Sequence, residues 1–229
     1  VLAVLQGEPA RNTVNAPFVL PEVHAALEPY IRVASVVGKL VTPLAEGQFV
    51  GVTIRYEGEI TQYDTSILKA AVLAGVLGPV TTGQVNLINS ARLAQERGLN
   101  VTEQQNAVAQ EYSSLISATL ETTEGSVTLA GTSMRNEPHI VKFNEYWLDI
   151  VPNVPYLLFV DNQDQPGSIG AVGTLAGRHN INISFMEVGR LNLRGRAMMI
   201  LGLDDAVPPE VMDEINALPH IYNARLVKL

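Results

Sequence analysis

The sequence predicts an α+β protein of two domains, a mixed α/β domain over residues 1–151 and a smaller domain over residues 152–229. Three observations support this prediction. Helical and alternating apolar patterns are mixed in the first part of the chain, strand and helix patterns follow in the order βαββαβ, and the segment Pro152–Pro155 separates the two parts. Two prolines in so short a segment cannot lie inside a sheet, so we interpret it as a linker.

The first elements of the larger domain are two helices around a strand. A helix is expected over Pro29–Leu44, where apolar residues recur at helical spacing and Gly47 follows as a stop signal. Phe49–Tyr56 alternates as a strand, with Val50 on its apolar face. Ser66–Leu77 is apolar on nearly all sides, which predicts a buried helix.

The rest of this domain is expected to add one helix and several strands. The helix covers Val85–Arg97, and a brief strand follows at Asn100–Thr102. Tyr112–Thr122 and Ser126–Met134 are separated by a Glu-Gly turn, which predicts a hairpin. His139–Ile150 supplies one or two further strands.

The smaller domain has six expected elements in the order βαββαβ. They are strands at Tyr156–Asp161, Ile181–Arg190, Gly195–Asp204 and His220–Lys228, and helices at Pro166–Arg178 and Pro208–Leu218. This order corresponds to a ferredoxin-like arrangement, in which two helices cover one face of an antiparallel sheet. Many functions share that topology, so function has to be argued from residues.

Composition and charge exclude several classes of protein. With 15 Lys+Arg against 23 Asp+Glu and no basic run, we expect neither nucleic acid nor an anionic membrane as a partner. No apolar stretch approaches the roughly 20 residues that span a bilayer. The absence of cysteine excludes disulfides and thiolate metal sites and fits a cytoplasmic location. Because the chain begins on Val1 rather than Met, we expect a piece of a longer protein.

A polar loop in the smaller domain is the best candidate for a binding site. The apolar strand stops at Asp161–Asp164, and a helix begins near Pro166. Free N–H groups in the first helical turn, around Ile169 and Gly170, favour an anion, and Asp164 offers a carboxylate to a cation. Together these groups suit the carboxylate and ammonium of an amino acid.

Short stretches of the sequence resemble a known family. Asp164–Gly167 and Ile181–Ile183 resemble the marks of an ACT domain, the amino-acid-sensing module of biosynthetic enzymes. Four further stretches are similar to the intervening domain of D-3-phosphoglycerate dehydrogenases of the long type: Leu5–Glu8, Asn12–Pro17, Tyr30–Gly38 and Ile54–Gly58. The resemblance covers essentially the whole sequence.

The resemblance implies the C-terminal regulatory part of such an enzyme. Family members carry catalytic domains ahead of this region, oxidise 3-phospho-D-glycerate with NAD on the way to L-serine, and many are inhibited by L-serine. We therefore expect no catalytic, metal or cofactor site in this chain, with NAD bound elsewhere in the full-length enzyme. The expected partners are L-serine or a similar amino acid, the catalytic domains of the same polypeptide, and further copies joined through ACT domains.

The resemblance also assigns the effector residues. In the family, the loop after the first ACT strand and the start of the second bind serine, usually between two ACT domains. Those positions here are Asn162, Asp164 and Asn182, with the amides of Ile169 and Gly170 as added donors. Asp164 would take the ammonium, and the asparagines the carboxylate or hydroxyl. The alternative is structural, with Asp164 capping the helix and Asn182 holding a turn.

Other candidates are interpreted as structural. Three glycines lack dinucleotide-binding spacing and are expected to allow close packing of helix on sheet: Gly167, Gly170 and Gly173. Three arginines surround a hairpin turn, where we favour a solvated tip over an anion site: Arg190, Arg194 and Arg196. Met186, Met198 and Met199 are expected to be buried against the helices. No two of the four histidines have metal-ligand spacing on one element.

Two other functions remain open. Bacterial iron–sulfur L-serine dehydratases combine a similar intervening domain and an ACT domain with a cysteine-bearing catalytic domain. The segment from Gly7 to Pro17 favours the dehydrogenase. The second alternative is a scaffold that only forms oligomers, in which the polar loop binds nothing.

Overall fold

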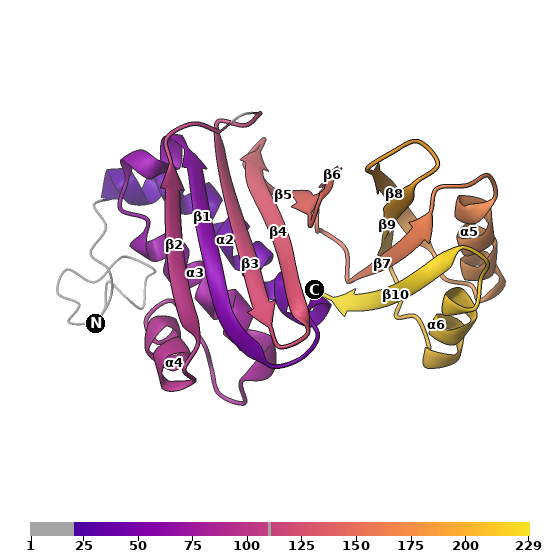
Figure 1. Cartoon of the computed structure of the whole chain (residues 1–229). Helices are drawn as coiled ribbons and strands as arrows, with labels where there is room; N and C mark the ends of the chain where they lie inside the picture. Colours follow the sequence, from indigo (N-terminus) through magenta and orange to yellow (C-terminus); the bar gives the residue numbers. More distant parts are fainter. Residues whose placement is uncertain (1–20, 110) are drawn as a thin grey trace.

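The computed structural model describes residues 21–109 and 111–229. The stretches Leu5–Glu8 and Asn12–Pro17 lie outside the described residues. The structure contains a large domain around a six-stranded sheet and a small domain around a four-stranded sheet, which lie side by side (Figure 1). The predicted α+β class is confirmed.

The first and the last helix of the large domain start elsewhere than predicted, whereas the helix at Ser66–Leu77 has the predicted bounds. They are α2 (Pro21–Leu44), α3 (Ser66–Leu77) and α4 (Ser90–Glu96), with short 3-10 turns η1 (Glu59–Gln62) and η2 (Gly78–Val80). Pro29 lies inside α2, because the apolar face extends back to the fully buried Leu27 and its packing outweighs one missing hydrogen bond. No helix in this described part of the chain is long and apolar enough to cross a membrane.

The start of α4 is displaced by asparagine side chains. Asn86 Oδ1 accepts the backbone N–H groups of Ile88 and Asn89, at 2.9 and 3.1 Å. Asn89 Oδ1 in turn accepts the N–H of Asn86, at 2.8 Å. Asparagine side chains that bind nearby backbone compete with helical hydrogen bonds, so the helix predicted from Val85 begins only at Ser90.

The large sheet has the order β2-β1-β3-β4-β5-β6. Its strands are β1 (Phe49–Gly58), β2 (Asn100–Asn106), β3 (Ser114–Thr122), β4 (Gly125–Met134), β5 (Glu137–Phe143) and β6 (Tyr146–Ile150). The predicted hairpin is β3–β4. Val50 is 49% exposed, not on the buried face, because the register of β1 against β3 shifts between Phe49 and Gly51 and the alternation restarts there.

The long helix α2 and the buried helix α3 cover one face of the large sheet (Figure 1). The two helices touch backbone to backbone where each carries a glycine. A Cβ atom on Gly38 would collide with the carbonyl oxygen of Val72, and one on Gly75 would lie 2.6 Å from that of Ser35. Only glycine allows so close a crossing.

The small domain has the predicted βαββαβ order. Its elements are β7 (Tyr156–Gln163), α5 (Ser168–Arg178), β8 (Ile183–Arg190), β9 (Arg196–Leu203), α6 (Pro209–Asn216) and β10 (Ile221–Lys228). The strands form an antiparallel sheet in the order β10-β7-β9-β8. Residues from α5 and α6 pack against one face of this sheet in a core of their own, which includes Val160, Val172 and Val211.

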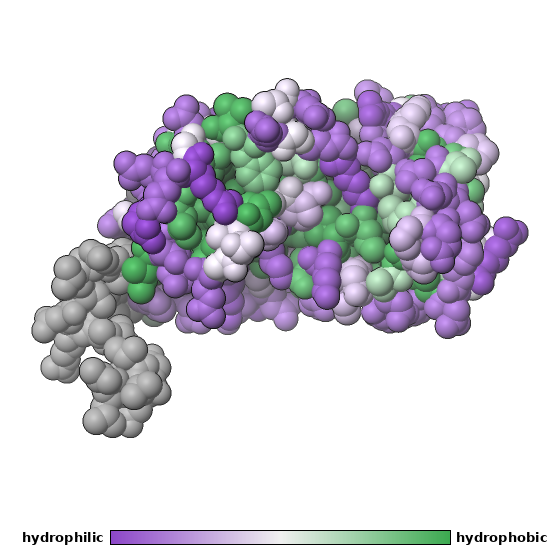
Figure 2. Space-filling view, turned by 90° about the horizontal axis from the view of Figure 1, so that it is seen from below, coloured by the Kyte–Doolittle hydropathy of each residue, from purple (hydrophilic) through white to green (hydrophobic). Residues whose placement is uncertain are grey.

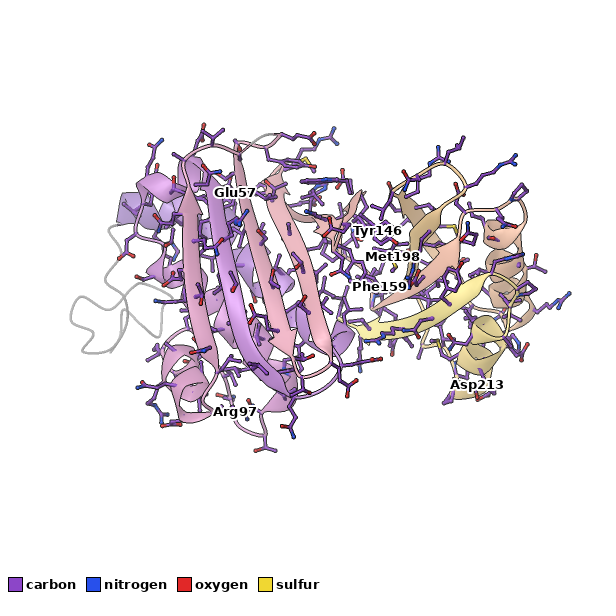
Figure 3. The ribbon with its side chains drawn as sticks, viewed as in Figure 1. Glu57, Arg97, Tyr146, Phe159, Met198 and Asp213 are labelled. Atoms are coloured by element: carbon purple, nitrogen blue, oxygen red, sulfur yellow. The ribbon has the colours of Figure 1, made fainter. Side chains whose placement is uncertain are left out.

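The other face of the small sheet packs against the large domain. Leu157, Phe159 and Met198 belong to the core of the large domain, and the rings of Phe143 and Phe159 are 5.3 Å apart. Figure 3 shows Tyr146, Phe159 and Met198 gathered between the domains. The prediction that Met198 packs against the helices is therefore wrong, because neighbours on a strand point to opposite faces. Met199 and Met186 do pack on the side of the helices.

Candidate functional site

The first polar residue of the site, Asn162, is buried near the end of β7. It is 1% exposed and lies on the same side of the strand as Val160, which faces the helices. Asn162 Nδ2 donates to the carbonyl of Gln163 at 3.0 Å, whereas Oδ1 has no partner among residues 21–109 and 111–229. A buried unpaired acceptor costs about 1–3 kcal/mol. This oxygen therefore keeps an unused acceptor beside the loop that follows β7.

The first turn of α5 lies beside this asparagine. Ser168 Oγ donates to the same carbonyl of Gln163, at 3.2 Å. The N–H groups of Ile169 and Gly170 donate to no acceptor in the described ranges. Such free amides at a helix start, together with the helix dipole, favour an anionic group.

Asp164 brings a negative charge to the same loop. Its N–H donates to the carbonyl of Gly195 at 2.8 Å, which fixes the loop against the start of β9. Its carboxylate accepts a hydrogen bond from Arg190 Nη1 at 3.0 Å. The Asp164 side chain is 28% exposed and that of Arg190 is 52% exposed, so a small molecule can reach the pair.

Asn182 lies at the opposite end of the small sheet. It immediately precedes β8, whose first residue pairs with Leu203 at the end of β9. Asn162 pairs with Ala197, near the start of β9. Asn162 and Asp164 therefore lie near the start of β9 and Asn182 lies near its end. Within one chain, Asn182 is about the length of a strand away from the other two residues.

The structural role expected as an alternative is found for Asn182 but not for Asp164. Asn182 Nδ2 donates to the carboxylate of Asp204 at 2.5 Å, so Asn182 ties together the loops at this end of the sheet. Asp164 does not cap α5, because the N-cap is Gly167 and no side chain caps that helix. Gly167 has a φ of 97°, which explains the glycine there.

One interpretation of the neighbouring residues is wrong. A Cβ atom on Gly170 or Gly173 would meet no atom within 4 Å, so these glycines do not serve close packing of helix on sheet. The turn after β8 is exposed, as interpreted, and its arginines also make ion pairs, Arg190 with Asp164 and Arg196 with Asp161. The hydrogen bonds to Asp161 raise the pKa of Arg196 above its ordinary value.

A groove of about 460 Å³ between the domains is a second concave site. Phe143, Phe159 and Met198 lie in it, and Figure 2, seen from below, shows hydrophobic residues reaching the surface between the domains. Its arginines, Arg196 and Arg225, both already pair with carboxylates. The loop at Asn162 combines a buried unpaired acceptor, free helix amides and a carboxylate, so we take the loop as the candidate amino-acid site. No cluster of metal-ligating side chains occurs in the part of the chain that the structure describes.

Comparison with family models decides the family. The model of the D-3-phosphoglycerate dehydrogenase intervening domain matches residues 26–144, which is more than half of the chain. The model of the ACT domain matches residues 156–220. The chain belongs to the D-3-phosphoglycerate dehydrogenase family. Its large domain is the intervening domain, and its small domain is the ACT domain.

Individual D-3-phosphoglycerate dehydrogenases match along the full length of the chain. The enzyme of Synechocystis sp. is 37% identical over 99% of the chain, that of Methanocaldococcus jannaschii 33% over 99%, and that of Bacillus subtilis 31% over 100%. The matched region makes up 41%, 43% and 44% of these proteins. The chain thus spans about two fifths of the relatives that it matches.

The ACT domain brings together part of the predicted site and adds one residue to it. Asn162, Asp164, Ile169 and Gly170 lie around one loop, whereas Asn182 does not. Arg190 is the addition, since its guanidinium reaches Asp164 across the start of β9. The sequence signals for it are its place among the three arginines around the turn after β8 and its place at the same end of the sheet as the polar loop.

Proposed function

We propose that this chain is the regulatory region of a D-3-phosphoglycerate dehydrogenase and that its ACT domain binds a small amino acid, with L-serine as the first candidate. NAD-dependent oxidation of 3-phospho-D-glycerate would take place in catalytic domains outside this chain. The observation that carries the proposal is the unpaired Asn162 Oδ1, buried beside the free amides of α5 and close to Asp164. These groups match the donors and acceptors of an amino acid.

A second copy of the chain would complete the site. β8 is an edge strand of the ACT sheet, and edge strands pair readily with another chain. In an antiparallel pair of two β8 strands about a twofold axis, the start of one strand lies opposite the end of the other. Asn182 of the second copy would then lie near Arg190, at the end of the sheet that holds Asn162.

The alternatives are less well supported. A dehydratase regulatory region and a pure scaffold share the ACT domain, but the match over essentially the whole sequence is to D-3-phosphoglycerate dehydrogenases. A pure scaffold gives no reason for the unpaired Asn162 oxygen. The cytoplasmic location and the contact with catalytic domains of the same polypeptide remain parts of this proposal.

Calorimetric titration of L-serine into this chain tests the proposal, with D-serine and L-alanine as controls. We expect stereospecific binding that is lost in Asp164→Ala and weakened in Asn162→Ala. Sedimentation with and without L-serine would show whether binding requires a dimer. Absence of heat and of a thermal shift at millimolar L-serine would contradict effector binding and favour the scaffold.

A further inference from the structure

Asp164 and Arg190 place opposite charges side by side at the edge of the candidate site. Their carboxylate and guanidinium are 3.0 Å apart, although Asp164 follows β7 and Arg190 ends β8. The two strands flank β9, so the arginine side chain crosses the start of β9 to reach the carboxylate. The pair sits beside the loop that contains Asn162.

Arg190 contributes only part of its hydrogen-bonding capacity to this pair. Nη1 is the one nitrogen that donates to Asp164, while Nε and Nη2 have no partner among residues 21–109 and 111–229. Arg196, six residues later, instead holds Asp161 with both Nε and Nη2. A guanidinium binds a carboxylate best through two parallel hydrogen bonds. Arg190 therefore keeps donors for a second carboxylate, whereas Arg196 already makes its two parallel hydrogen bonds to Asp161.

We propose that Arg190 binds the α-carboxylate of the effector while Asp164 binds its ammonium group. This inference rests on the proposed function, because it assigns the polar ends of the amino acid bound there. A zwitterion would insert between the two side chains and exchange one ion pair for two. Asn162 Oδ1 and the amides of α5 would then be left for the side-chain hydroxyl of the effector.

The assignment predicts that the affinity gained from Arg190 depends on whether the ligand carries a carboxylate. L-serinamide keeps the ammonium but lacks the carboxylate, and N-acetyl-L-serine keeps the carboxylate but lacks the ammonium. In Arg190→Met, L-serine should bind at least tenfold more weakly. L-serinamide should bind that variant as well as the wild type or more tightly, since Asp164 is then free of its competing guanidinium.

The test is calorimetric titration of these three ligands into the wild type, Arg190→Met and Arg194→Met. Arg194 is exposed on the same turn, and the structure gives its side chain no partner in the described ranges, so Arg194→Met makes the same change in net charge away from the pair. We expect Arg194→Met to bind L-serine within twofold of the wild type. Thermal unfolding and sedimentation of each variant would verify that fold and assembly are retained.

The outcomes separate this inference from the function on which it rests. If the wild type does not bind L-serine, the proposed function fails and the assignment fails with it. If the wild type binds and Arg190→Met binds equally tightly, the proposed function stands and the role of Arg190 is wrong. Equal losses for L-serine and L-serinamide in Arg190→Met would likewise overturn the role, because they would indicate general damage to the loop.

Discussion

Arg225 of β10 donates a hydrogen bond from Nη1 to the backbone carbonyl of Leu44, the last residue of α2, at 2.6 Å. The last carbonyls of a helix have no partner within it and lie at the negative end of its dipole. α2 has no basic residue in its last turn, so the ACT domain supplies the cation. The same guanidinium also pairs with Glu46. One arginine thereby joins the ACT sheet to the longest helix of the intervening domain.

Arg225→Met is expected to lower the free energy of unfolding by about 1–2 kcal/mol, because it removes a charge-assisted hydrogen bond and a favourable charge at a helix end. Urea denaturation measures the change. Glu46→Gln is the control, since its side chain is 63% exposed and an exposed ion pair contributes about 0–1 kcal/mol. An equal loss in both variants would show that the ion pair, and not the helix end, stabilises the contact.

Gly75→Ala is expected to cost about 3 kcal/mol or to prevent folding, since its Cβ would lie 2.6 Å from both the Ser35 carbonyl oxygen and the Lys39 nitrogen. Gly173→Ala in α5 is the matched change in another helix, where a Cβ meets no atom within 4 Å. There we expect a gain of about 0.5–1 kcal/mol, the difference in helix propensity. Circular dichroism melts measure both. Similar effects at the two positions would argue against the close helix crossing.

The elements that the sequence predicted well are those that local chemistry determines. Ser66–Leu77 is a helix with the expected ends, because it is apolar on nearly all sides and Gly78-Pro79 follows. The βαββαβ order also follows from local patterns. Where side chains compete with backbone, as Asn86 does before α4, the same patterns give the wrong start.

Contacts that depend on register and on packing between domains could not be predicted. Asp164 and Arg190 are 26 residues apart in the sequence. They meet because β7 and β8 lie on either side of β9 in the sheet, which brings the ends of these two strands close together. Phe159 and Met198 have the pattern of ordinary core residues, and nothing local shows that their face is covered by the intervening domain. The bulge that exposes Val50 likewise arises from pairing with β3.

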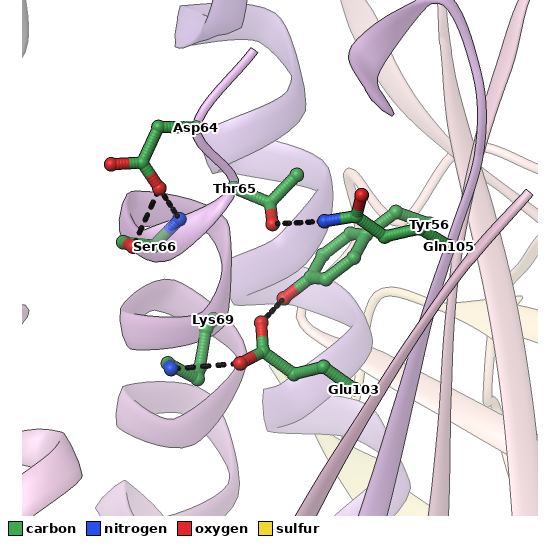
Figure 4. A network of polar contacts seen from close by, with 7 residues as sticks. All are labelled: Tyr56, Asp64, Thr65, Ser66, Lys69, Glu103 and Gln105. Carbon is green, nitrogen blue, oxygen red and sulfur yellow. Dashed lines mark hydrogen bonds and ion pairs between the residues drawn. The ribbon is translucent and has the colours of Figure 1, made fainter. Parts of the chain in front are cut away.

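The Tyr56 hydroxyl is predicted to stabilise the intervening domain and to make it sensitive to alkali. Tyr56 is fully buried and donates to Glu103 at 3.3 Å, and Glu103 also pairs with Lys69 at 2.8 Å (Figure 4). Tyr56→Phe should cost about 1 kcal/mol at pH 7, since Glu103 keeps its lysine. Urea denaturation at pH 7 measures this loss.

Burial, followed by the charge of Glu103, raises the pKa of Tyr56. A raised folded-state pKa gives stability that is present below the unfolded value of about 10 and is lost above it. The wild type should therefore lose stability between pH 9 and pH 11 more steeply than Tyr56→Phe. Parallel curves for the two proteins over this range would contradict the prediction.

Asp64 is predicted to make the start of α3 sensitive to acid. Its Oδ1 accepts hydrogen bonds from Ser66 Oγ at 2.6 Å and from the Ser66 N–H at 2.9 Å (Figure 4). These bonds, with the hydroxyl as the larger contributor, hold the pKa of Asp64 below its usual value of 3.8. A lowered pKa gives stability that is present above the unfolded value and is lost as pH falls through the folded value. At pH 7, Asp64→Ala should cost about 1 kcal/mol.

Urea denaturation of wild type and Asp64→Ala from pH 7 to pH 2.5 measures this dependence. The difference in unfolding free energy should be constant above pH 5 and should shrink below about pH 4, because the protonated carboxyl is a weaker acceptor. Ser66→Ala, which removes the hydroxyl and keeps the N–H, should show a smaller difference that shrinks over the same range. A difference between wild type and Asp64→Ala that stays constant down to pH 2.5 would mean that the carboxylate charge does not stabilise the helix start.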